Sequence, residues 1–158
     1  MSSSRNYAFD TQIIHSFYNQ SENNGSLVPP IYQTATYSFS SEEEGGEYFS
    51  GAKLGYIYTR INNPTLNLLE KRIADLEKGD AAIVFSSGMG AITSTFCSLM
   101  NSGDELLVDM TDYGCTYSFF HNGLERFGVK VRHIDMSDPD IVVQSINENT
   151  RAIFLNHL

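Results

Sequence analysis

The chain has 158 residues, of which 41% are apolar and 18% charged, a composition typical of a folded globular domain and not of a disordered segment. Ten Lys and Arg against nineteen Asp and Glu give a formal net charge of −9, and no basic run exceeds a pair, so nucleic acid is a poor candidate partner. No apolar window approaches a membrane-spanning length and no apolar signal core follows the start, so we expect a cytoplasmic protein with no membrane partner.

The first 62 residues have no sustained helical or strand period, yet they are rich in Tyr and Phe. A long irregular stretch is unusual in a compact domain and is normally functional or reaches elsewhere. Its aromatic side chains also need a surface on which to pack. We therefore predict that residues 1–62 form an extended N-terminal arm that lies across a neighbouring subunit, and that residues 63–158 form a separate domain.

Regular structure is expected to begin at Asn63, a favourable N-cap, followed by Pro64 at the first helical position. An apolar stripe continues to Leu76, and Lys78 with Gly79 should end this helix. The apolar run at 81–85 predicts a buried strand, and the following glycines open a helix from Gly88 to about residue 100.

The same alternation continues to the end of the sequence. Strands are predicted at 105–109, 129–134 and 151–155, and helices at 116–127, stopped by Gly128, and from 137–139 to about 147. Strands that alternate with helices predict an α/β fold on a largely parallel sheet with flanking helices.

The two cysteines, Cys97 and Cys115, are too few for a disulfide framework, which suits a reducing compartment. Neither they nor the four histidines have the spacing of a metal site, so no metal is expected. Cys97 lies in an apolar run and is predicted to be a small buried residue.

A first candidate site is the pair Tyr58 and Arg60. In an extended segment alternate side chains share a face, so a hydroxyl donor and a guanidinium would point the same way, as a phosphate site requires. The simpler alternative is a surface strand with a solvated arginine.

A second candidate is the segment SSGMG at 86–90, where a strand is predicted to lead into a helix. Free backbone N–H groups and the positive end of the helix dipole meet there, and Gly88 and Gly90 let a ligand approach, so the site suits an anion. The segment is neither the dinucleotide fingerprint nor a Walker loop. The alternative is a tight turn in which glycine serves geometry only.

A third candidate follows the strand at 105–109, at the edge where open α/β sheets bind ligands. The ring of Tyr113 could lie on a flat aromatic cofactor, and Cys115 would then border the same pocket. Alternatively, Tyr113 is a turn aromatic and Cys115 a small buried residue. The Gly-x-Ser-x-Gly motif of many hydrolases is absent.

Four segments in order, PPIYQTAT (29–36), YTRINNPT (58–65), SSGMGAI (86–92) and DYGCT (112–116), resemble the trans-sulfuration family of Cys/Met-metabolism enzymes. The family uses pyridoxal 5′-phosphate on a fold type I transferase scaffold. Cysteine at position 115, where the family commonly has glycine, resembles the methionine γ-lyases. Cystathionine γ-lyase, cystathionine γ-synthase and the O-acylhomoserine sulfhydrylases remain alternatives.

The resemblance implies a role for each candidate residue. Tyr58 and Arg60 would reach the cofactor phosphate in a neighbouring subunit, within a dimer that shares its sites and pairs into a tetramer. The amides of Gly88 and Met89 would hold the phosphate on the home side. Tyr113 would stack on the pyridine ring and exchange a proton with the leaving sulfur of a sulfur-containing amino acid, with Cys115 near the substrate side chain. Methionine would give methanethiol, ammonia and 2-oxobutanoate.

The sequence also departs from the family. The Schiff-base lysine, expected in a Ser-x-Thr-Lys context, is not among the four lysines present, which are Lys53, Lys71, Lys78 and Lys130. The last residues, Asn-His-Leu at 156–158, also differ from the usual acidic and proline-containing continuation. We therefore expect residues 63–158 to be the incomplete first part of the cofactor-binding domain, in a truncated, frame-shifted or partial copy with little turnover of its own.

Two readings from other classes stay open. The chain could be a non-catalytic fragment or a partner that contributes Tyr58 and Arg60 to a full-length relative. It could also be a simple phosphate- or nucleotide-binding module that uses the 88–90 turn. A planar aromatic such as Tyr113 beside that turn favours a flat cofactor over the last reading.

Overall fold

The computed structural model describes residues 7–156 and divides into two compact units, one up to Val84 and one from Phe85 onward. Each unit is taken by itself. The predicted division after residue 62 differs from this boundary, because the helix that follows Asn63 belongs with the first unit. That the arm reaches a neighbouring subunit stays a prediction.

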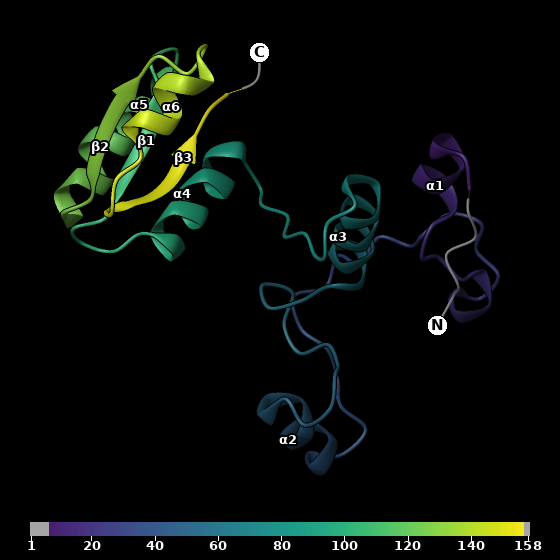
Figure 1. The fold of residues 1–158 in the computed structure, drawn as a ribbon. Helices are drawn as coiled ribbons and strands as arrows, with labels where there is room; N and C mark the ends of the chain where they lie inside the picture. Colours follow the sequence, from purple (N-terminus) through teal and green to yellow (C-terminus); the bar gives the residue numbers. More distant parts are fainter. Residues whose placement is uncertain (1–6, 157–158) are drawn as a thin grey trace. The chain divides into compact units, whose positions relative to one another are not determined.

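The second unit is built on a three-stranded parallel sheet in the order β2-β1-β3. The strands are β1 (Glu105–Asp109), β2 (Lys130–Ile134) and β3 (Thr150–Phe154). The helices are α4 (Gly88–Leu99), α5 (Gly114–Asn122), a 3₁₀ turn η2 (Leu124–Phe127) and α6 (Pro139–Ser145). Helices flank the sheet (Figure 1), which confirms the predicted α/β fold with a parallel sheet.

The core of this unit lies between one face of β1 and the helices α4 and α5. Leu106 and Val108 point to this face and are fully buried. Phe120 of α5 is also fully buried, and its ring meets Phe96 of α4 and Phe154 of β3 edge to face at 5.1 and 5.3 Å. Edge-to-face packing adds to the energy of apolar burial, so this aromatic cluster fastens both helices to the sheet.

Three expectations for residues 81–127 are wrong in detail. Residues 81–85 are not a strand: no described strand pairs with them, and Ile83 is 75% exposed. The helix predicted at 116–127 begins at Gly114 and breaks at Gly123, where a Cβ would lie 2.5 Å from a backbone oxygen. Cys97 is exposed, because Phe96 occupies the face of α4 that meets the sheet.

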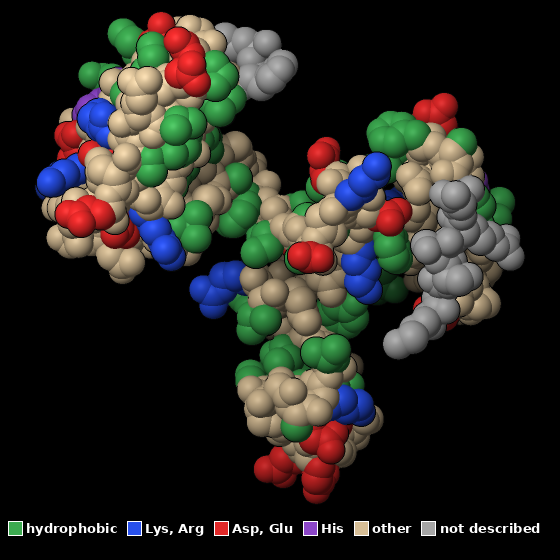
Figure 2. Space-filling view, viewed as in Figure 1, with side chains coloured by type: hydrophobic (Ala, Val, Ile, Leu, Met, Phe, Trp, Pro, Cys, Tyr) green, Lys and Arg blue, Asp and Glu red, His purple; other side chains and the backbone are tan. Residues whose placement is uncertain are grey.

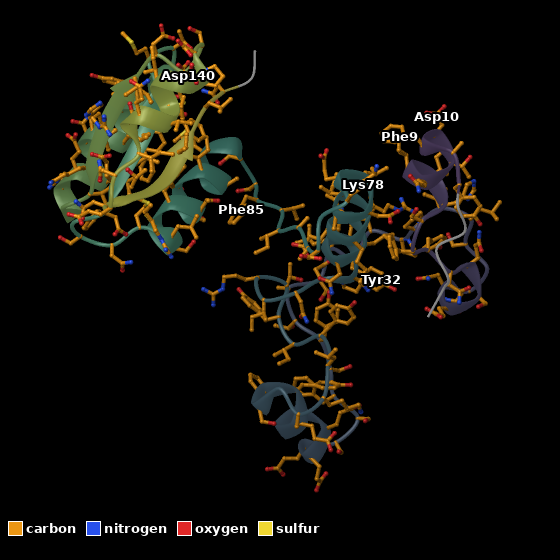
Figure 3. All side chains as sticks on the ribbon, viewed as in Figure 1. Phe9, Asp10, Tyr32, Lys78, Phe85 and Asp140 are labelled. Atoms are coloured by element: carbon orange, nitrogen blue, oxygen red, sulfur yellow. The ribbon has the colours of Figure 1, made fainter. Side chains whose placement is uncertain are left out.

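In the first unit the helix after Asn63 is confirmed as α3 (Pro64–Glu77). The Asn63 side chain accepts a hydrogen bond of 2.9 Å from the Thr65 amide, and Pro64 is the first helical residue. Lys78, labelled in Figure 3, ends the helix in the left-handed conformation with φ 54°. The apolar stripe of α3 stays partly exposed, for example 45% at Leu69. Figure 2 shows hydrophobic side chains at the surface of both units.

The segment predicted to be irregular contains three short helices, α1 (Phe9–His15), η1 (Gln20–Asn23) and α2 (Glu42–Ser50). Helix α1 is stabilised from outside its own sequence, since Arg72 of α3 donates hydrogen bonds to the carbonyl oxygens of Ile14 and Ser16. Helix α2 contains two adjacent glycines, which weaken any helical signal. The prediction failed because tertiary contacts and end caps outweigh weak local propensity there.

A buried carboxylate links the three strands at their amino ends. Glu105 accepts hydrogen bonds from Arg132 (2.9 Å), Asn147 (2.7 Å) and Thr150 (3.0 Å), and the Arg132 guanidinium is the main cause of a lowered pKa at Glu105. Because the pKa is lower in the folded state, the stabilisation is present at neutral pH and is lost as pH falls through that lowered pKa.

We expect Glu105→Gln to lower the free energy of unfolding at pH 7 by about 1–2 kcal/mol, a modest value because Arg132 is partly exposed. The difference from wild type should shrink in acid, and chemical denaturation at several pH values would measure it. Glu148→Gln is the matched control, since Glu148 is exposed. An equal effect of both changes would contradict this role for Glu105.

Candidate functional site

The amino end of α4 has the geometry of an anion site. Ser87 is the N-cap, and its hydroxyl oxygen accepts a 3.0 Å hydrogen bond from the Gly90 amide. Within residues 7–156 the amides of Gly88 and Met89 have no acceptor, as expected for the first residues of a helix. A Cβ placed on Gly88 would meet no atom within 4 Å, so an approaching ligand has room.

Tyr113 and Cys115 lie at the amino end of the next helix, α5. Tyr113 is its N-cap residue, and its side chain is 66% exposed. Cys115 is exposed as well, so the alternative of a small buried residue does not hold. The Thr116 hydroxyl lies 3.7 Å from the Met89 sulfur, which joins the first turns of α4 and α5. The structure therefore brings Gly88, Met89, Tyr113 and Cys115 to one edge of the unit.

That edge is the carboxyl edge of the parallel sheet, because the segment leading to α5 follows the end of β1 at Asp109. Open parallel sheets bind ligands at this edge. Free amides for an anion, an exposed phenol ring and a thiol are together there, which suits a ligand with one phosphate and one flat ring.

Asp112, directly before Tyr113, has an unusual environment that sequence reasoning missed. One carboxylate oxygen, Oδ1, accepts hydrogen bonds from the Tyr113 amide (2.8 Å) and from the Asn156 side chain (3.0 Å). The other oxygen, Oδ2, is buried and has no hydrogen-bond partner in the part of the chain that the structure describes. Burial raises the pKa of Asp112 above its usual value.

Tyr58 and Arg60 belong to the first unit and come together in a way that the sequence did not predict. Tyr58 forms a single bridge with Thr36, and the chain then turns, since the Ile61 amide donates to the Tyr58 carbonyl at 2.8 Å. The expected extended segment is therefore wrong. The turn instead places the Arg60 guanidinium over the Tyr58 ring, 5.3 Å from its centre.

Arg60 is exposed, and among the described residues it forms no ion pair with a carboxylate. A guanidinium that is already held by an aromatic ring and has its donors free is well prepared for an oxyanion.

His121 and His133, which the sequence analysis did not connect, are in contact in the structure. The Nε2 atoms of His121 on α5 and His133 on β2 are 2.9 Å apart, and His121 contacts Glu125 at 3.1 Å. The contact ties α5 to the edge strand. Spacing in the sequence could not reveal it, because one histidine lies on a helix and the other on a strand.

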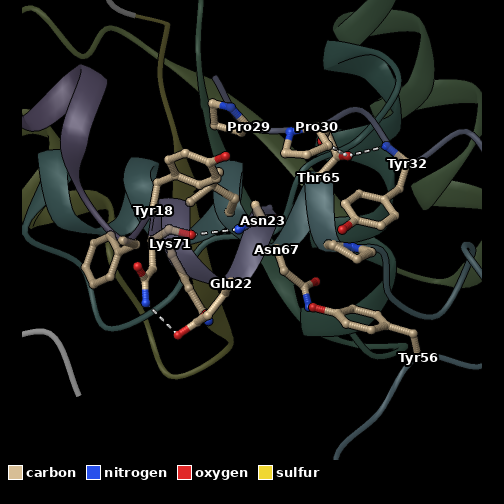
Figure 4. Close-up of a pocket in the computed structure, with 14 residues that line it drawn as sticks. Tyr18, Glu22, Asn23, Pro29, Pro30, Tyr32, Tyr56, Thr65, Asn67 and Lys71 are labelled. Carbon is tan, nitrogen blue, oxygen red and sulfur yellow. Dashed lines mark hydrogen bonds between the residues drawn. The ribbon is translucent and has the colours of Figure 1, made fainter. Parts of the chain in front are cut away.

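The first unit has a groove of about 270 Å³ between the arm and α3 (Figure 4). Its lining includes Tyr18, Tyr32 and Tyr56, together with Asn67 and Lys71. None of the predicted site residues lines it. No helix in residues 7–156 combines the length and apolar character needed to cross a bilayer.

Comparisons with known proteins show the family of this chain. The model of the Cys/Met metabolism PLP-dependent enzymes matches residues 10–158. An L-methionine γ-lyase of Pseudomonas deceptionensis is 49% identical over 95% of this chain and 38% of that protein. A homocysteine synthase of Schizosaccharomyces pombe is 36% identical over 95% of this chain and 35% of that protein.

A solved structure from Campylobacter jejuni, provisionally identified as an O-acetylhomoserine (thiol)-lyase, has a TM-score of 0.84 and 34% identity. The match covers 94% of this chain and 36% of that one, which contains N′-pyridoxyl-lysine-5′-monophosphate. The chain thus spans between 35% and 38% of the length of these relatives. The family model covers nearly all of this sequence, and the chain belongs to the Cys/Met metabolism enzymes that depend on pyridoxal 5′-phosphate.

Proposed function

We propose that this chain carries the phosphate-binding and ring-binding part of a carbon–sulfur lyase that acts on L-methionine and yields methanethiol, ammonia and 2-oxobutanoate. One observation supports the proposal most strongly. The free amides of Gly88 and Met89 lie at the same edge of the second unit as Tyr113 and Cys115. Similarity to L-methionine γ-lyases supports the choice of substrate. A cytoplasmic location is part of the proposal.

The residues present fit pyridoxal 5′-phosphate. The amides of Gly88 and Met89 would bind the phosphate with the help of the α4 dipole, and the guanidinium of Arg60 from a second copy would neutralise its charge. When bound, the cofactor supplies an electron sink for bonds at the substrate's α-carbon.

Tyr113 has two roles in this proposal. Its exposed ring would lie against the cofactor's ring, and its hydroxyl would pass a proton to the sulfur that leaves. Cys115 would border the substrate side chain and favour methionine over the bulkier substrates of related enzymes. Tyr113→Phe should keep cofactor binding, because the ring is retained, while it removes the proton donor.

Tyr58 and Arg60 would serve the site of a second copy, in a dimer that pairs into a tetramer. We expect Arg60→Ala to weaken binding of pyridoxal 5′-phosphate by roughly 10- to 100-fold, the value of a charge-assisted hydrogen bond. Calorimetric titration would measure the change. Arg126→Ala, at another exposed arginine, is the control.

Mixing variants tests whether the site is shared. Arg60→Ala removes only the guanidinium that the arm would contribute to the site of the other copy. Gly88→Pro removes only an amide of the copy that holds the cofactor. If the site spans two copies, half of the dimers in an equal mixture contain one chain of each variant. Each of these mixed dimers has one site in which both Arg60 and the Gly88 amide are intact, so about one site in four should bind the cofactor as in the wild type. No recovery would contradict a shared site.

A second candidate is a cystathionine-directed enzyme or an O-acylhomoserine sulfhydrylase, favoured by the similarity to a homocysteine synthase. Substrate preference, measured on the chain completed by the remaining part of the enzyme, separates these activities. We propose that the 158 residues alone bind the cofactor without turnover, as a fragment or partner would, because no lysine here has the expected context.

The direct test compares pyridoxal 5′-phosphate with pyridoxal, which lacks the phosphate. The proposal expects the phosphorylated form to bind at least tenfold more tightly, because the α4 amides and Arg60 act on the phosphate alone. Equal affinities would leave the proposed phosphate site without support and contradict the proposal.

A further inference from the structure

Asp112 links two neighbouring strand ends to Tyr113. Its side chain lies just beyond β1, and Asn156, which donates to it at 3.0 Å, lies just beyond β3. The same oxygen accepts from the Tyr113 amide at 2.8 Å. The backbone of Tyr113 is thus fastened to both strands through one carboxylate.

The Tyr113 ring depends on this backbone anchor. It is 66% exposed, and it stacks on no other ring among residues 7–156. Tyr113 also caps α5 without a side-chain hydrogen bond. With so little packing on the side chain, the direction of the ring is set mainly by the orientation of its own backbone.

The Asp112 carboxylate lowers the stability of the fold at this position. Its Oδ2 atom is buried and has no hydrogen-bond partner among residues 7–156, and a buried unpaired polar atom costs about 1–3 kcal/mol. Such groups call for an explanation beyond stability. An apolar residue at 112 would avoid the cost, but it would leave both the Tyr113 amide and the Asn156 amide without this acceptor.

From these contacts we propose that Asp112, held in place by Asn156, is a positioning residue that orients the ring of Tyr113. Its value for cofactor binding rests on the proposed function, in which that ring lies against the pyridine ring. The ordering of Tyr113 itself needs no cofactor.

The two side chains offer a charge-exchange test on the whole chain. Asn156→Asp places a second carboxylate against Asp112, and like charges at this distance repel. The double variant Asp112→Asn with Asn156→Asp restores one amide and one carboxylate. Because one oxygen of Asp112 accepts both hydrogen bonds in the wild type, the amide at position 112 has to turn in this variant, so that its oxygen accepts from the Tyr113 backbone and its nitrogen donates to the carboxylate at position 156.

Nuclear magnetic resonance of ring-labelled tyrosine provides a readout that does not use activity, with the Tyr113 signal assigned through Tyr113→Phe. We expect the ring to become more mobile in Asn156→Asp and to regain its wild-type order in the double variant. Thermal unfolding of each variant checks that the fold is kept. Asn149→Asp, at an exposed asparagine directly before β3, is the control.

Unchanged order of the Tyr113 ring in Asn156→Asp would overturn the proposal, and so would a double variant in which the ring is as mobile as in Asn156→Asp. Titration with pyridoxal 5′-phosphate adds a separate result, in which loss of ring order should weaken binding by roughly 2- to 10-fold. A change in ring order with no change in affinity would support positioning by Asp112 and contradict the stacking role of Tyr113 in the proposed function.

Discussion

Phe120→Ala should lower the free energy of unfolding of the second unit by about 3–5 kcal/mol, the largest stability effect that we expect for one substitution. The Phe120 ring is fully buried and packs edge to face on both Phe96 and Phe154. Its removal leaves a cavity beneath α5 and takes away two aromatic contacts. Because β1 packs against the same cluster, both the helix and the sheet lose support.

Hydrogen exchange of the β1 amides measures this loss in the second unit alone, whatever the first unit does. Phe127→Ala is a matched control, since the Phe127 side chain is 72% exposed and its removal should change little. Equal loss of protection in both variants would show that Phe120 is not the centre of the core.

Gly88→Pro should weaken binding of pyridoxal 5′-phosphate by roughly 10- to 100-fold, because proline removes one amide proposed to hold the phosphate. The change is compatible with the helix. Proline is favoured at the first helical position, and Ser87, with φ −155° and ψ 155°, already has the extended conformation that precedes a proline. Helix α3 begins with a proline in the same position, at Pro64.

Gly88→Ala is the control, since alanine keeps the amide and its Cβ would meet nothing within 4 Å. Calorimetric titration of both variants would therefore separate loss of a hydrogen-bond donor from loss of space. If Gly88→Pro binds as tightly as Gly88→Ala, the amide of Gly88 does not bind the phosphate.

The elements that the sequence predicted well carry their own local signals. Helix α3 has its N-cap at Asn63, its proline at Pro64 and its end at Lys78, and the structure has the same limits. The strands β1, β2 and β3 were predicted within about one residue at each end, because short apolar runs between turn residues are informative in a parallel sheet.

The elements that the sequence missed depend on contacts far along the chain. Helix α1 is held by Arg72, more than fifty residues away, and no local pattern encodes that contact. Residues 81–85 have the composition of a buried strand, but a strand also needs a hydrogen-bonding partner, and no described strand pairs with them.

Some residues of the candidate site could be predicted from local sequence patterns, and others could not. Gly88 and Met89 follow from a glycine-containing turn at the start of a helix, and Tyr113 and Cys115 from the end of a strand. Asp112 was missed because its importance comes from Asn156, which lies 44 residues later. The Tyr58 and Arg60 pair was chosen for an extended geometry, whereas a turn brings the two side chains together.

The central claim is that this chain binds pyridoxal 5′-phosphate through its phosphate and ring while none of its own lysines bonds to the cofactor. Borohydride reduction of the purified, cofactor-loaded chain, followed by intact mass measurement, tests both parts when combined with a binding titration. The account predicts phosphate-dependent binding and no specific adduct. A single stoichiometric pyridoxyl adduct on Lys53, Lys71, Lys78 or Lys130, or no binding of the cofactor at all, would contradict it.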